Sequence, residues 1–242
     1  MQQIESSPKF IHKLVKPLVS LGIFFAVLLV LWIVDSTYRV RNIDVTGSVK
    51  SRAVYGLESL YGQSMLLHET ETFTQHIKRA NPTLSSIIVT KSYPNTLKVK
   101  LAYSRPVAAL QVSNGFFLLD ETGLIVEKQS SSPSAAIPPI LYYQQFSASD
   151  YDLGTNISAQ DIKGALFFLK KLQSLGITIN SIDIDGFHML GLYGSDIAYI
   201  FSVEKDTKLQ AYQLEQVVKK LKLEGTEYTK IDFRFDKPIL TL

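Results

Sequence analysis

The sequence contains no cysteine among its 242 residues. Without cysteine the chain cannot build a disulfide framework, use a thiolate nucleophile, or bind zinc or an iron–sulfur cluster through thiolates. It also lacks a strong charge of one sign, since 25 Lys and Arg residues stand against 22 Asp and Glu residues. A nucleic-acid-binding protein usually has a strongly basic face, so this balance argues against that class. A hydrophobic content of 46% excludes a wholly disordered chain.

One long apolar run lies near the N-terminus. Residues 17–34 include no charged side chain, and Lys16 and Asp35 bracket them. A helix of that length spans roughly 27 Å, close to the hydrocarbon thickness of a bilayer. Trp32 and Tyr38 lie near its far end, where aromatic side chains favour the membrane interface. The run therefore predicts a transmembrane helix over residues 17–34.

Two other interpretations of this run are weaker. A signal peptide has a shorter apolar region followed by small residues, whereas this run ends in residues 33–38, IVDSTY, a poor cleavage site. A buried core helix would show a polar face, and this run offers only Ser20. Basic residues flank the run on both sides, so charge barely decides orientation. Because a long folded domain translocates largely regardless of its charge, we expect a cytoplasmic tail over residues 1–16 and the bulk outside the cytoplasm.

The remaining sequence predicts an α+β fold in two parts. Residues 40–103 have the pattern β-α-α-β-β, and the following residues predict a mixed β domain with two main helices. In the first part we expect strands at Val40–Val45, Ser86–Lys91 and Thr96–Tyr103, with helices from Ser51 to Gly62 and from Glu69 to Ala80. In the second part we expect strands at Val107–Val112, Phe116–Leu119, Leu124–Glu127, Ser181–Asp185, His188–Tyr193, Ile197–Val203 and Lys230–Phe235, a loop at Gln129–Pro139, a helix opened by Ser158 and Asp161, and a helix from Asp206 to Leu223.

Candidate catalytic residues are few. His68 and His76 are eight residues apart, but no carboxylate completes a metalloprotease motif. Asp183 and Asp185 share one face of a strand, which a solvent-facing edge explains equally well. His188 stands alone. The sequence therefore predicts no catalytic residue, no metal site and no cofactor, and we expect a protein that is not an enzyme.

Five segments, in order behind the apolar run, resemble the FtsQ/DivIB family of bacterial cell-division proteins. Each one alone is a weak signal, but a chance match would have to reproduce order, spacing and topology together. In one segment Arg105 stands directly before Pro106, one residue tighter than the family pattern. The segments are VRNIDVTG at 40–47, VTKSYPNTLKV at 89–99, SRPVA at 104–108, FFLLDETG at 116–123 and IDFRFDKP at 231–238.

This resemblance implies a layout and a function. The layout is a cytoplasmic tail at 1–16, a transmembrane helix at 17–34, a POTRA domain at 35–106 and a β domain at 107–242. The function is that of a non-enzymatic bitopic scaffold of the divisome, located in the cell membrane at the division septum. In that role it would link early and late division proteins, bind FtsB/DivIC-like and FtsL-like bitopic coiled-coil partners, and help to control septal peptidoglycan synthesis.

The resemblance also points to a partner-binding site at the end of the chain. Phe235 falls where the family often has an aromatic residue that matters for partner contact. A terminal strand with a free edge can accept a partner strand through backbone hydrogen bonds. The alternative for Phe235 is ordinary burial in phase with Ile231 and Phe233. The residues expected to form the site are Arg234, Phe235, Asp236, Pro238, Ile239 and Leu240.

Two other functions remain open from the sequence. One is a POTRA-containing secretion or membrane-assembly factor, which would usually carry several POTRA repeats or a membrane barrel. The other is a membrane-anchored cell-wall enzyme, which would need a nucleophile or metal constellation.

Overall fold

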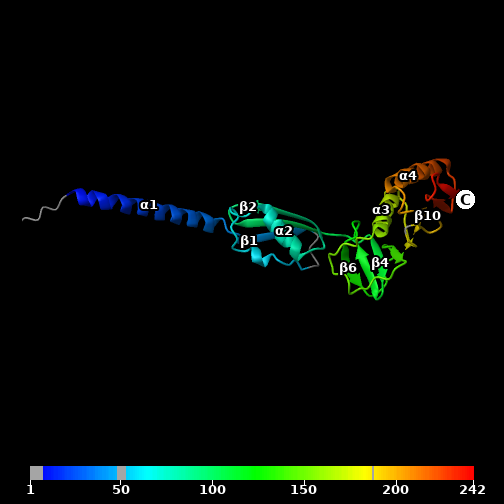
Figure 1. Ribbon diagram of the computed structural model, residues 1–242, viewed down its shortest axis with the longest axis horizontal. Coiled ribbons are helices and arrows are strands. Elements are labelled where there is room, and N and C mark those ends of the chain that lie inside the picture. The colour runs from blue at the N-terminus through cyan, green and yellow to red at the C-terminus, as the bar shows by residue number, and fades with distance from the viewer. Residues whose placement is uncertain (1–7, 48–52, 187) are drawn as a thin grey trace, which may run out of the picture. The chain divides into compact units, whose positions relative to one another are not determined.

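The computed structural model describes residues 8–47, 53–186 and 188–242. The chain divides into two compact units, of which the first comprises Met1–Asn81 and Ser86–Ala102 and the second Pro82–Ser85 and Tyr103–Leu242. Both units contain helices and strands, so the structure is of the mixed α+β class that the sequence predicts (Figure 1).

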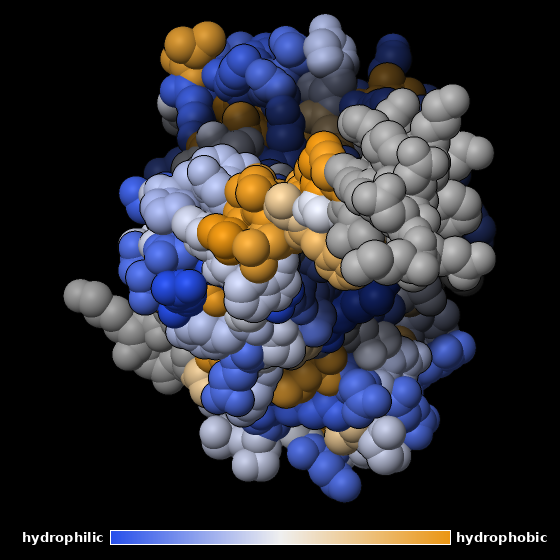
Figure 2. All heavy atoms as spheres, turned by 90° about the vertical axis from the view of Figure 1, so that its left-hand side faces the viewer, coloured by the Kyte–Doolittle hydropathy of each residue, from blue (hydrophilic) through white to orange (hydrophobic). Residues whose placement is uncertain are grey.

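The long helix α1 (Pro8–Thr37) contains the predicted apolar run. Its segment Val19–Thr37 has a mean hydropathy of 2.3, and none of that segment is buried. Figure 2 looks at the molecule from the N-terminal end of α1 and shows hydrophobic residues, in orange, exposed on this face of the molecule. By length and composition α1 can cross a membrane, as expected.

The first unit is built on a three-stranded sheet with the order β1-β3-β2. Strand β1 (Asn42–Gly47) pairs in parallel with β3 (Thr96–Tyr103), and β2 (Leu84–Ser92) precedes β3 along the chain. Helix α2 (Thr70–Ala80) supplies an amphipathic face to this unit. The core residues from α2 and β3 are almost completely buried; they are Phe73, Ile77, Leu97, Val99 and Leu101.

The expected helix from Ser51 to Gly62 is wrong. Residues 53–57 are not helical, and only a short 3₁₀ turn, η1 (Glu58–Leu60), forms there. Gly56 has a φ of +81°, in the left-handed region, which interrupts a right-handed helix. Ser51, the expected cap, lies outside the described residues. The specific POTRA arrangement therefore stays a prediction, whereas the second helix and the hairpin of this part form where the sequence predicts them.

The second unit holds a mixed sheet, whose described strands have the order β12-β11-β10-β9-β8-β7-β4-β5-β6. The pairs β4–β7, β7–β8 and β10–β11 are parallel, and the other pairs are antiparallel. Its helices are α3 (Gln160–Ser174) and α4 (Thr207–Glu224). Its strands are β4 (Ala108–Val112), β5 (Gly115–Leu119), β6 (Ile125–Gln129), β7 (Pro139–Tyr142), β8 (Ser181–Ile184), β9 (Leu190–Tyr193), β10 (Ala198–Phe201), β11 (Lys230–Asp232) and β12 (Ile239–Thr241).

Three details of this unit differ from expectation, besides the end of the strand expected at Lys230–Phe235. Strand β7 is not among the expected strands, because Pro138 directly before it and Pro139 at its start are typical of loops. Ser158 does not cap α3; the cap position is Ala159, and the Asp161 carboxylate accepts from the backbone N–H of Ile162 instead. His188 lies in the turn before β9 rather than in a strand.

A stack of three phenylalanine rings forms the centre of the second core. Phe201 on β10 lies 3.8 Å from the ring centroid of Phe168 on α3 and 5.0 Å from that of Phe233, with nearly parallel planes in both pairs. All three side chains are buried. The stack therefore joins helix α3, the interior strand β10 and the residue that directly follows β11.

We expect Phe233→Ala to lower the free energy of unfolding by about 3–5 kcal/mol, because it leaves a cavity beside Phe201. The matched control is Phe235→Ala, two residues further on, where the ring is 49% exposed and the loss should be small. Urea unfolding of the full chain in detergent, followed by circular dichroism, measures both. Equal losses in the two variants would contradict this description of the core.

Candidate partner-binding surface

Strand β12 forms one edge of the sheet in the second unit. Among the described strands it pairs with β11 alone, in antiparallel register from Ile239 opposite Asp232 to Thr241 opposite Lys230. Its three residues are all exposed, including Ile239 at 50% and Leu240 at 38%. An edge strand presents backbone N–H and C=O groups that a further strand can pair with.

Phe235 lies in the bend between β11 and β12 and not in a strand, because β11 ends at Asp232. The expected strand Lys230–Phe235 is therefore wrong in its last residues. Ile231 and Phe233 are fully buried, but Phe235 is 49% exposed, so the alternating burial proposed for it does not occur. The Arg234 guanidinium lies 5.9 Å from the centroid of the Phe235 ring.

A buried carboxylate holds this bend in shape. Asp232 is 4% exposed, and its Oδ1 accepts from the backbone N–H of Arg234 at 3.1 Å. The Arg234 guanidinium donates to both carboxylate oxygens, with Nη2 to Oδ2 at 2.7 Å. Burial alone would raise the pKa of Asp232, but the hydrogen bonds and charge of Arg234 outweigh burial and hold that pKa below its usual value. Asp232 therefore stays ionised, and Arg234 positions the bend rather than projecting freely.

The other predicted residues complete the surface. The exposed carboxylate of Asp236 forms an ion pair with Lys205 Nζ at 3.1 Å. The backbone carbonyl of Asp236 accepts a hydrogen bond from Gln213 Nε2 at 3.0 Å. Gln213 belongs to α4, so its hydrogen bond ties the bend to that helix. Pro238 lies between the bend and β12 and leaves the strand itself uninterrupted.

Leu242, directly after β12, extends this surface, although no sequence motif points to it. Leu242 is 77% exposed and lines a pocket of about 700 Å³ with Ile197, Tyr228 and others at the start of β10 and β11. On α4, Leu209 and Tyr212 are 57% and 62% exposed. Their spacing of three residues places them on one face of α4, a pattern that is visible in the sequence.

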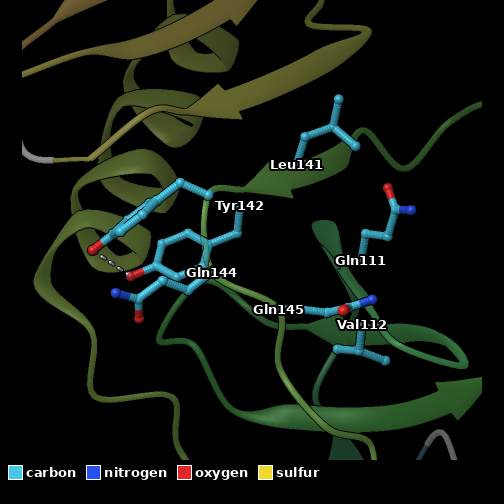
Figure 3. Close-up of a pocket in the computed structure, with 7 residues that line it drawn as sticks. Gln111, Val112, Leu141, Tyr142, Gln144 and Gln145 are labelled. Atoms are coloured by element: carbon cyan, nitrogen blue, oxygen red, sulfur yellow. Dashed lines mark hydrogen bonds between the residues drawn. The ribbon is translucent and has the colours of Figure 1, made fainter.

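A second pocket, of about 240 Å³, lies near the carboxyl ends of β4 and β7. It is lined by Gln111, Val112 and residues 141–145, none of which carries a formal charge at neutral pH. Figure 3 shows the hydrogen bond between the Tyr142 and Tyr143 hydroxyl groups, 3.5 Å apart. Burial raises the pKa of Tyr142, so its hydroxyl stays protonated and can serve only as a hydrogen-bonding group.

None of the histidines considered in the sequence lines either pocket. His76 on α2 pairs with the Ser59 hydroxyl at 2.6 Å in an exposed position, and His68 packs against the Phe73 ring before α2 begins. His188 lies 3.0 Å from Glu204 on the surface. Within residues 8–47, 53–186 and 188–242, no group of three or more His, Cys, Asp or Glu side chains could hold a metal ion.

The chain is similar to a bacterial cell-division protein. It is 24% identical over 168 residues to the Cell division protein FtsQ of Anaeromyxobacter sp. (strain K), a match that covers 68% of this chain and 55% of that protein. The chain thus spans about half the length of the curated relative that it matches. No family model matches the chain. The similarity agrees with the family that the sequence motifs resemble.

We expect Arg234→Ala to raise the pKa of Asp232 and to destabilise the fold by about 1–3 kcal/mol at pH 7, because the buried carboxylate loses its guanidinium donors and keeps the backbone N–H of residue 234. In the native chain the lowered pKa makes Asp232 stabilising above about pH 4, and this contribution is lost as pH falls through that lowered value. In Arg234→Ala the ionised Asp232 carboxylate destabilises the fold. The difference in unfolding free energy between the native chain and the variant should therefore narrow below about pH 4, where the carboxylate becomes protonated.

Carbon-13 NMR of the Asp232 carboxyl measures the pKa, and unfolding curves at two pH values measure the gap. Arg234→Lys is the control, since it keeps the charge but loses the forked geometry of the guanidinium. Its Asp232 pKa and its stability should lie between those of the native chain and of Arg234→Ala. An Asp232 pKa unchanged in Arg234→Ala would contradict this account of the bend.

Proposed function

We propose that the chain is a membrane-anchored, non-enzymatic scaffold of the bacterial division machinery. The observation that carries the proposal is the exposed edge strand β12, preceded by a bend that holds Phe235 half exposed. The similarity to an FtsQ and the apolar helix α1 support it. In this proposal residues 1–16 are cytoplasmic, α1 spans the membrane, residues 35–106 form a POTRA domain and residues 107–242 a β domain outside the cytoplasm, at the septum.

Partner capture follows from the chemistry of an edge strand. A short extended segment of the partner adds beside β12, and its backbone pairs with the outward groups of residues 239–241. Side chains supply the selectivity, because alternate residues of the added strand point to opposite faces of the sheet. Phe235, Ile239 and Leu240 offer apolar area beside that edge, and the pocket next to Leu242 can accept a side chain at the end of the ladder.

The proposed partners are FtsB/DivIC-like and FtsL-like bitopic coiled-coil proteins, as the resemblance implies. Such partners would reach the second unit with a segment beyond their coiled coil. By holding them at the septum, the scaffold would link early and late division proteins and help to control septal peptidoglycan synthesis. This role requires no substrate turnover.

We expect Phe235→Glu to weaken partner capture by at least about tenfold, equivalent to 1.4 kcal/mol, because a charge replaces an apolar anchor at the interface. The measurement is a crosslinked pull-down of the full chain from dividing cells, quantified for short bitopic coiled-coil proteins. The matched control is Leu153→Glu. Leu153 has a similar exposed fraction, 50%, but it lies in the loop before α3 and belongs to neither β11, β12 nor the bend between them. This control should retain capture.

The outcomes separate the family from the site. Loss of capture in Phe235→Glu alone supports both the scaffold and the β12 surface. Equal capture of division proteins by both variants would support a scaffold whose contact lies elsewhere. If the native chain retrieves no division component, or releases soluble fragments from peptidoglycan, the proposed function is wrong.

A further inference from the structure

The first unit carries exposed apolar side chains close to the end of α1, far from β12 in sequence. Leu67 is 79% exposed, and Leu66, Tyr61 and Tyr93 are 49%, 52% and 57% exposed. Contiguous apolar side chains on a protein surface usually mark a contact with a partner or a membrane.

Backbone hydrogen bonds tie this segment to the residues that directly follow α1. The N–H of Met65 donates to the Tyr38 carbonyl at 2.8 Å, and the N–H of Val40 donates to the Gln63 carbonyl at 2.9 Å. The N–H of Gly62 donates back to the Val40 carbonyl at 2.9 Å. Residues 62–65 are therefore fixed beside residues 38–40, which begin one residue after α1 ends.

The turn at Ser64–His68 directs its leucines away from the core. The N–H of His68 donates to the Ser64 carbonyl at 3.3 Å, and the N–H of Leu67 lies 3.4 Å from the Ser64 hydroxyl. Met65 is fully buried, whereas Leu66 and Leu67 on the same turn are exposed. The turn thus uses one side chain for folding and leaves two large apolar side chains unused.

The position of this turn is set by the end of the membrane-spanning segment. The apolar segment of α1 ends at Thr37, and Met65 is bonded to Tyr38. Leu67 follows Met65 by two residues, which reach at most about 7 Å, a length comparable with the roughly 5–8 Å depth of one interfacial layer of a bilayer. Leu67 therefore lies within reach of that layer whenever α1 spans the bilayer.

Aromatic residues gather at the same junction. The rings of Tyr38 and Tyr93 meet edge to face, with centroids 5.7 Å apart. Backbone N–H groups of Arg41 and Asn42 both donate to the Asn95 carbonyl, so the β2–β3 turn is held there too. Tyrosine is enriched at membrane interfaces because its ring is apolar and its hydroxyl is wet.

We propose that Leu66 and Leu67, flanked by Tyr61 and Tyr93, form a second membrane contact that inserts into the interface of the bilayer that α1 spans. This inference rests on the membrane anchoring in the proposed function. The occupant is the lipid bilayer, because the turn is continuous with the end of the spanning segment. The contact fixes the first unit on the membrane surface instead of leaving it to pivot about residue 38.

The absence of cysteine in the chain allows a direct test. Single cysteines are introduced at Leu67, at Ile88 and at Val27, and each is labelled with the fluorophore NBD in the full chain. Ile88 is the matched control, because it is 53% exposed in the same unit but lies four residues, roughly 13 Å of strand, before the end of β2. Val27 reports whether α1 is inserted.

The labelled chains are placed in nanodiscs that contain two kinds of doxyl-labelled lipid, one with the quencher close to the headgroup and one with the quencher deep in the acyl chain, near the level of residue 27. The proposal predicts quenching and a blue-shifted emission at 67, and neither at 88. Quenching at 27 without quenching at 67 would overturn the second contact while leaving the anchor intact. Absence of quenching at 27 would overturn the anchor and the contact together, and neither result depends on partner capture at β12.

A second variant checks that insertion depends on the turn's apolar character. Leu66→Asp in the chain labelled at 67 should reduce the quenching, because a charge would have to enter the interface. Ser86→Asp adds the same charge to an exposed position on β2 and should leave the quenching unchanged. Quenching that survives Leu66→Asp would contradict the proposal.

Discussion

The stack of Phe168, Phe201 and Phe233 is the interaction on which the terminal surface depends. It fixes the residue that directly follows β11 in the core of the second unit. One residue earlier, the buried carboxylate of Asp232 binds Arg234 and turns the chain. Because both anchors precede the bend, the bend itself can leave Phe235 exposed and still have a defined shape. Strand β12 then returns along β11 and ends the sheet with an open edge.

Much of the fold could be predicted from periodicity. The α2 and α4 helices and the β2–β3 hairpin follow apolar spacings that are read directly from the sequence. The helix expected to start at Ser51 failed because the left-handed backbone at Gly56 interrupts it, which spacing alone does not reveal. Strand β7 could not be predicted, because Pro138 and Pro139 favour a loop when only the local sequence is considered. In the structure the neighbouring strands β4 and β8 hold this segment in the sheet.

The candidate site, too, could be predicted from the sequence only in part. The family motif points to Phe235 and a terminal strand as a candidate partner-binding site, but alternation with Ile231 and Phe233 predicts that the strand continues through Phe235. The strand ends at Asp232 because a buried side chain, and not the apolar pattern, decides where the chain bends. The edge position of β12 could not be predicted from local sequence, since it depends on the order of strands that are far apart in the chain. Leu242 and its pocket were missed for that reason.

The two proposed contacts use different units and different physics. The first unit meets lipid through leucines fixed beside the end of α1, where the hydrophobic effect and tyrosine amphipathicity act. The second unit meets protein through a backbone edge, where hydrogen bonds give affinity and flanking side chains give selectivity. Both surfaces depend on a buried neighbour, Met65 in one and Phe233 in the other, that holds exposed apolar side chains in place.

The central claim is that a partner strand adds to β12. Hydrogen–deuterium exchange of the full chain, with and without its captured partner, tests this most directly. The account predicts that amides of residues 239–241 exchange more slowly in the complex, with smaller changes at β6 on the opposite edge. Slower exchange confined to residues 40–103, with β12 unchanged, would contradict it.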